Sequence, residues 1–178
     1  VLSTERASVN SNLRFSEAML SCRSREEPYR YVRERECDWF RVQARTLDRD
    51  GSDSASGFRE NAFEISGGVQ REIDSDQHAG WGLSYERSRI NLDSAKGESD
   101  GDRFQIGGVL KHTYDNAVVS GTASLGYAAY DTLRDTGLPA PDTLASSDHD
   151  ITFVSAHLRF ARVFPRDTTM SEEIYDIE

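Results

Sequence analysis

Carboxylates are the first residues of this sequence whose type could support acid–base chemistry. Glu64, Glu72 and Glu86 fall in segments of alternating polarity, where each projects from the polar side of an expected strand. A general acid–base pair needs two such groups beside one reacting atom. No Gly-x-Ser-x-Gly motif and no phosphate-binding glycine loop accompanies them. We therefore favour a role in lining a hydrated interior.

Metal binding finds equally little support. The histidines lie in separate segments without the spacing of metal ligands: His78, His112, His149 and His157. The aspartates around Gly51 resemble a calcium loop, but the glycine comes too early and the distal glutamate is misplaced. We expect no metal, no cofactor and no enzymatic activity.

Two cysteines, Cys22 and Cys37, could form a disulfide. In an oxidising compartment such a bridge would add about 3 kcal/mol in the loop-entropy model. The pair lacks the Cys and His partners of a zinc site. A disulfide is the favoured interpretation, and two free thiols are the alternative.

Six segments alternate apolar and polar residues, which predicts strands. They are residues 37–46, 61–73, 79–87, 103–114, 119–130 and 151–164, and a seventh could begin at Ile174. We expect the polar sides to line an interior through Arg41, Gln43, Arg45, Glu64, Gln70, Glu86, Arg103, Gln105, Lys111 and Arg159. These side chains would keep the lumen hydrated and hold a helix by charged contacts.

The lengths of the strands and connections favour a membrane barrel. Strands 103–114 and 119–130 exceed the usual five or six residues and suit a tilted membrane crossing of roughly nine to eleven. Long acidic connections (47–58, 90–101, 131–150) alternate with short turns, as in outer-membrane barrels. Tyr114 lies at one end of this hairpin and Tyr127 and Tyr130 at the other, which predicts aromatic girdles. A porin-like barrel and a soluble lipocalin-like ligand-binding barrel remain alternatives.

The N-terminal segment predicts a polar helix. Residues 2–21 contain no Gly or Pro, and Leu2, Val9, Leu13 and Leu20 mark its apolar positions. Such a helix cannot anchor a core but could stand in a hydrated lumen. A dense charged connector, residues 23–36, follows it.

Composition excludes other classes. The sequence has 37% hydrophobic residues and no apolar run near twenty residues, which excludes a transmembrane helix. A net charge of −10 argues against a nucleic-acid partner, because phosphate binding needs a basic face.

Several motifs together resemble a known family. They are the Phe15–Cys22 stretch, Cys37-Asp38-Trp39, Gly67-Gly68-Val69-Gln70, Gly80-Trp81-Gly82-Leu83-Ser84-Tyr85-Glu86, Gly101-Asp102-Arg103-Phe104-Gln105-Ile106-Gly107-Gly108, and Gly126-Tyr127 with Tyr130-Asp131 and Arg134. In this order and spacing the chain resembles the C-terminal translocator β-domain of autotransporters, the type V secretion proteins of Gram-negative bacteria.

The resemblance implies a fold, a location and partners. It implies a twelve-stranded barrel in the bacterial outer membrane, with a linker helix in its pore. The implied partners are outer-membrane lipid, the protein's own N-terminal passenger domain and the barrel-assembly machinery. Some members cut their linker at paired asparagines, but Asn10 and Asn12 are not contiguous.

About six strands are too few for that barrel. We therefore expect an all-β, antiparallel up-and-down transmembrane barrel that is partial and preceded by a helix. Residues 1–36 would form the linker helix and charged connector, and residues 37–178 the first half of the barrel.

Overall fold

The computed structural model describes residues 2–26, 31–49, 57–92, 97–115, 117–138, 144–164 and 171–177. Helix α1 (Leu2–Met19) is followed by a small antiparallel pair, β1 (Arg23–Glu26) and β2 (Tyr31–Glu34). Seven further strands form one sheet: β3 (Cys37–Arg49), β4 (Phe58–Asp74), β5 (Gln77–Leu92), β6 (Gly97–Tyr114), β7 (Ala117–Asp135), β8 (Leu144–Phe164) and β9 (Ser171–Ile177).

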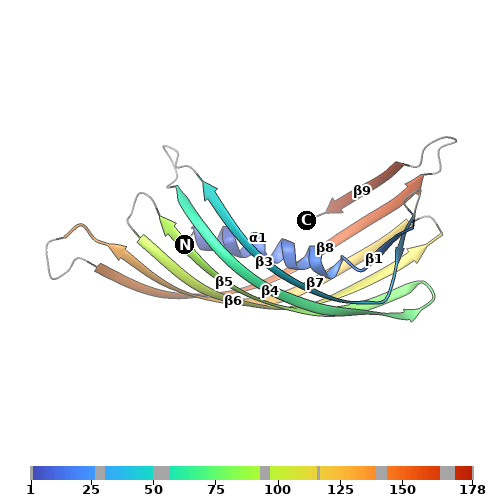
Figure 1. Ribbon diagram of the computed structural model, residues 1–178, viewed down its shortest axis with the longest axis horizontal. Helices are drawn as coiled ribbons and strands as arrows, with labels where there is room; N and C mark the ends of the chain where they lie inside the picture. The colour runs from blue at the N-terminus through green and yellow to red at the C-terminus, as the bar shows by residue number, and fades with distance from the viewer. Residues whose placement is uncertain are drawn as a thin grey trace.

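The large sheet is an open, up-and-down antiparallel trough. Each strand pairs with its neighbours in the chain, so β3 and β9 form the two edges. The sheet curves around α1, which lies on its concave side (Figure 1). The expected all-β architecture with an N-terminal helix is confirmed, and the sheet is partial, as the strand count predicts. No helix among the described residues is long and apolar enough to cross a membrane.

Cross-strand register separates the sheet into apolar and polar rows. One row of partners on the convex side comprises Phe40, Gly67, Leu83, Ile106, Leu125 and Val154. The neighbouring row on the concave side comprises Arg41, Ser66, Ser84, Gln105, Gly126 and Phe153. Because side chains alternate along every strand, one register places most of the large apolar side chains on the convex face, and Phe153 is an exception in the concave row.

The strands are longer than the sequence predicts, and the long connections are correspondingly shorter. Strand β4 begins at Phe58 rather than residue 61, and β8 at Leu144 rather than residue 151. In these extensions both faces carry polar residues, which hides the alternation on which the prediction depended. Exposed ion pairs such as Arg59–Asp48 link the extended strands side by side.

The charged connector also contains more structure than expected. Its backbone forms the β1–β2 pair, in which Arg23 lies opposite Glu34. The alternation in these four-residue strands is too short to stand out in a densely charged segment.

Helix α1 begins at Leu2, as predicted, but its buried face differs from the predicted apolar stripe. Val9 is exposed, whereas Ser11, Phe15 and Met19 are buried against the sheet. The apolar part of this contact is confined to the C-terminal end, where Phe15, Met19 and Leu20 pack with Val109 and Trp39. Polar residues form the rest because the concave wall is itself polar.

Candidate functional site

A broad apolar band covers the convex face of the sheet. Its exposed members are Phe40, Val42, Phe63, Ile65, Trp81, Leu83, Phe104, Ile106, Leu110, Val119, Leu125, Tyr127, Val154, Leu158 and Phe160, here called the outer apolar band. Phe104 and Leu158 are 55% and 57% exposed, and neither lies beneath a second protein layer. Water-exposed proteins rarely expose so large a continuous patch, whereas a barrel wall facing lipid requires one.

Aromatic and charged side chains bound the outer apolar band. On the side of the long connections, Tyr85, Phe104 and Tyr127 are partners in one cross-strand row. Tyr85 donates a hydrogen bond to Asp102 over 2.6 Å. On the side of the short turns, Tyr114 is exposed and its ring contacts His112. Such aromatic rows are typical of the boundary between hydrocarbon and headgroups.

Tyr130 does not belong to this girdle, so that part of the prediction is wrong. It is only 2% exposed and lies on the concave side. There it accepts a hydrogen bond from Arg103 and contacts Ser8 of α1 over 3.4 Å. Position 130 has the opposite strand parity to Tyr127, so its ring must project to the opposite face.

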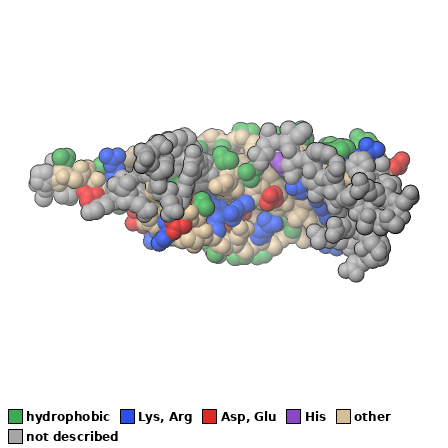
Figure 2. Space-filling view, turned by 90° about the horizontal axis from the view of Figure 1, so that it is seen from above, with side chains coloured by type: hydrophobic (Ala, Val, Ile, Leu, Met, Phe, Trp, Pro, Cys, Tyr) green, Lys and Arg blue, Asp and Glu red, His purple; other side chains and the backbone are tan. Residues whose placement is uncertain are grey.

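Four charged residues form an inner charge cluster on the concave face: Arg45, Glu60, Glu86 and Arg103. Arg45 bridges Glu60 at 2.7 Å and Glu86 at 3.0 Å. Arg103 forms a second ion pair with Glu86. Each guanidinium thus neutralises carboxylates from a different strand, and the cluster ties β3, β4, β5 and β6 together. Glu60, Glu86 and Arg103 are buried, and the surface view in Figure 2 shows further basic and acidic side chains near the middle of the molecule.

Helix α1 is held to this wall mainly by neutral hydrogen bonds. Asn12 accepts bonds from Ser124 at 3.3 Å and Ser155 at 2.6 Å. Ser11 accepts a bond from Gln105 at 2.9 Å. Hydroxyl and amide groups of this kind fix the helix in one register without surrounding it with apolar side chains.

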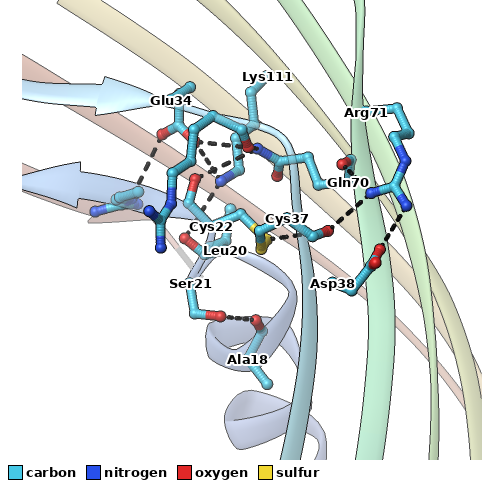
Figure 3. The surroundings of a disulfide bond; sticks show 12 residues. Ala18, Leu20, Ser21, Cys22, Glu34, Cys37, Asp38, Gln70, Arg71 and Lys111 are labelled. Carbon is cyan, nitrogen blue, oxygen red and sulfur yellow. Dashed lines mark hydrogen bonds and ion pairs between the residues drawn. A yellow bond between two sulfur atoms is a disulfide. The ribbon is translucent and has the colours of Figure 1, made fainter.

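A tighter set of contacts holds the C-terminal end of the helix. Lys111 donates to the backbone carbonyl of Leu20 over 3.3 Å and pairs with Glu34 at 2.6 Å. Cys22 and Cys37 form a disulfide, with Cα atoms 5.8 Å apart (Figure 3). The helix end is therefore joined both to the wall of the sheet and to the start of β3.

Glycines on the concave face give aromatic rings room to lie flat against the wall. A Cβ atom at Gly82 would come within 2.8 Å of the Trp39 ring, and one at Gly101 within 2.3 Å of the Tyr130 ring. Side chains at these positions would push both rings into the space of the helix.

The ten residues predicted to line the lumen all lie on the concave side of the sheet. Glu64, Gln70, Glu86, Arg103, Gln105 and Lys111 are buried there, and Arg41, Gln43, Arg45 and Arg159 are partly buried. Gln105 bonds Ser11 of the helix, and Lys111 and Gln70 bond the carbonyls of Leu20 and Cys22 just after it. Arg45, Glu86 and Arg103 bind one another and so organise the wall, whereas neutral groups and Lys111 hold the helix and its C-terminal end.

Several partners of these residues were not predicted from the sequence. Glu60 lies just before the predicted start of its strand, although it has the inward parity of Glu64. Glu34 lay in the expected connector, and nothing in the sequence links it to Lys111. The small polar residues of the helix could have suggested that Asn12 bonds the wall. Its serine partners, however, follow only from the position of the helix along the sheet.

The described residues contain no group of three or more His, Cys, Asp or Glu side chains that could hold a metal ion. An outward apolar band, a polar concave wall and a helix against that wall together define an outer-membrane type of β-barrel domain.

The comparison with protein families agrees with this class. The family model described as autotransporter beta-domain matches residues 39–172. The chain therefore belongs to the autotransporter β-domain family, whose members act as outer-membrane translocators. No curated protein and no solved structure matches the chain significantly.

Proposed function

We propose that this chain is the part of an autotransporter that carries an N-terminal passenger across the bacterial outer membrane and anchors it at the surface. Residues 1–36 act as the linker, with α1 inside the conduit, and residues 37–178 form part of the barrel wall. The partners are outer-membrane lipid, the passenger and the barrel-assembly machinery.

The direction of α1 is the observation that carries this proposal. Its C-terminal end lies near Lys111 and Cys37, close to the short turns after β4 and β6. Its N-terminal part lies near Tyr130, where β7 approaches the long connection to β8. In outer-membrane barrels the short turns face the periplasm and the long loops face outward. A polypeptide attached before α1 therefore leaves the conduit on the outer side.

The polar wall suits this task because a peptide in transit exposes unpaired backbone groups. Hydroxyl, amide and charged side chains on the wall can satisfy such groups, whereas an apolar lumen cannot. The inner charge cluster pairs acidic with basic groups, so the wall offers hydrogen bonds without a strong net charge of one sign.

Two epitope tags placed in the whole protein that carries this chain test the topology. One tag precedes Leu2 and the other lies in the turn between Asp74 and Gln77. We expect external protease to remove the first tag from intact cells and to leave the second one intact until the outer membrane is opened. The second tag is the matched control for cell integrity.

Protection of the first tag in intact cells, with the barrel correctly inserted, would exclude passenger display. That result would favour the porin-like alternative, which shares the wall but carries nothing to the surface.

A further inference from the structure

The connection between α1 and the first wall strand has far more length than it needs. Cys22 lies just after the end of α1 and Cys37 begins β3, fifteen positions later, yet their Cα atoms are only 5.8 Å apart. A fully extended chain of that length spans roughly 50 Å. Helix α1 itself, at 1.5 Å per residue, is about 27 Å long. Without the disulfide, and once the β1–β2 pair within it separates, the connector is long enough for the helix to move by its entire length.

Noncovalent contacts at the same place depend on the helix being seated. Lys111 donates to the carbonyl of Leu20, and Gln70 donates to that of Cys22 at 3.4 Å. Both side chains also bond Glu34, which is buried with them beside the disulfide (Figure 3). Lys111 and Gln70 lie on the wall, so their bonds to the helix end break once it moves.

We propose that the Cys22–Cys37 disulfide is a redox latch that fixes α1 in the conduit. The latch rests on the proposed function, because it requires α1 to occupy the path of the passenger. In the oxidised chain the helix is seated and the path is blocked. In the reduced chain the helix is held by noncovalent contacts alone: hydrogen bonds, the Lys111–Glu34 pair and the apolar packing at its C-terminal end. It can then move on a long connector.

The chemistry of the latch is thiol–disulfide exchange. The two cysteine thiols lose two protons and two electrons as the S–S bond forms, and a periplasmic protein disulfide takes up both and becomes a dithiol. A dithiol reductant reverses the step. Cys37 belongs to the wall and Cys22 follows the helix. A disulfide can form only when the two Cα atoms are close, as they are here at 5.8 Å, and this requires the helix to lie in its observed position. Oxidation therefore follows insertion of the helix.

Single-channel recording tests the latch in the whole protein, reconstituted in planar lipid bilayers. We expect the oxidised protein to remain closed and dithiothreitol to raise its open probability. Closure of a loop of this size shifts an equilibrium on the order of a hundredfold. The C22S/C37S variant should show the raised open probability with or without reductant. Reducing the folded wild type avoids any dependence on how that variant folds.

A second variant separates a latch from general damage. Lys111→Met removes the wall contact to the helix end, and its effect should depend on the disulfide. We expect little change in open probability when the disulfide is intact and a further increase of roughly tenfold in the C22S/C37S background. Arg71→Ala is the matched control, because Arg71 bonds the Cys37 carbonyl and Asp38 on the exposed side without touching the helix.

The two possible failures are distinguishable through deletion of helix residues 2–19. If that deletion opens the pore but reduction and C22S/C37S change nothing, the latch is wrong and the conduit stands. If the deletion leaves conductance unchanged, the helix does not block the path, and both the latch and the proposed conduit are wrong.

Discussion

The two faces of the sheet differ in which side chains they expose and which they bury. On the convex face, large apolar side chains such as Ile106 and Leu125 are exposed. On the concave face, charged groups such as Arg103 and Glu86 are buried. A water-soluble barrel would have the reverse arrangement. This contrast is typical of an outer-membrane β-domain, whose outer face meets hydrocarbon, and here the inner face is covered in part by the protein's own helix.

Ion pairs allow the two environments to be compared, because an Arg–carboxylate pair occurs both in the buried interior and at the exposed end of the sheet. Arg103 and Glu86 pair on the concave side with side chains 1% and 0% exposed. Arg59 and Asp48 pair beyond the outer apolar band with side chains 58% and 52% exposed. Burial, rather than the type of pair, should decide how much each contributes to stability.

Removal of the central inner charge should produce the largest effect. Arg103→Met leaves Glu86 buried with Arg45 as its remaining basic partner and removes the donor to Tyr130. Breaking a buried pair in this way costs about 3–5 kcal/mol. We expect a matching loss in the free energy of unfolding, measured by urea titration in lipid vesicles.

The double variant R103M/E86Q is the control, because it removes both charges and should recover part of the loss. Wild-type stability of R103M alone would show that water reaches Glu86 freely and that the concave face is not sealed.

A charge placed in the outer apolar band should have the next largest effect. Ile106 lies near the middle of the band, where lipid would have to accommodate a guanidinium. Ile106→Arg should cost about 2–4 kcal/mol in the same titration. Ile106→Leu keeps the position apolar and should change stability little. If I106R unfolds at the wild-type urea concentration, the convex face does not contact hydrocarbon.

The sequence predicted the faces of the strands far better than their ends or their partners. Alternation assigned Phe104 outward and Arg103 inward because a strand has only two sides. It could not extend β4 to Glu60, because beyond the outer apolar band polar residues such as Arg59 and Glu60 lie on both faces. The ends of a strand can thus be predicted from alternation only where its two faces meet different surroundings.

Contacts between residues far apart in the sequence could not be predicted, for a different reason. Glu34 and Lys111 are 77 positions apart, and only the curvature of the sheet around α1 brings them together. Asn12 meets Ser124 and Ser155 through the helix register, which the weak apolar stripe of α1 does not specify. The cysteine pair was the exception, because a sequence with two cysteines allows one intramolecular pairing.

The smallest effect should come from the exposed ion pair, which tests whether burial decides the contribution. Arg59→Ala removes the 2.6 Å contact with Asp48 at the start of β4. Exposed pairs contribute about 0–1 kcal/mol, since water and salt screen them and ordering two long side chains costs entropy. We expect R59A to unfold within this margin of the wild type and its difference to shrink further in high salt. A loss of stability as large as that of R103M would mean that the strand extensions contribute as much to the stability of the sheet as its buried cluster does. Burial would then not decide how much an ion pair contributes.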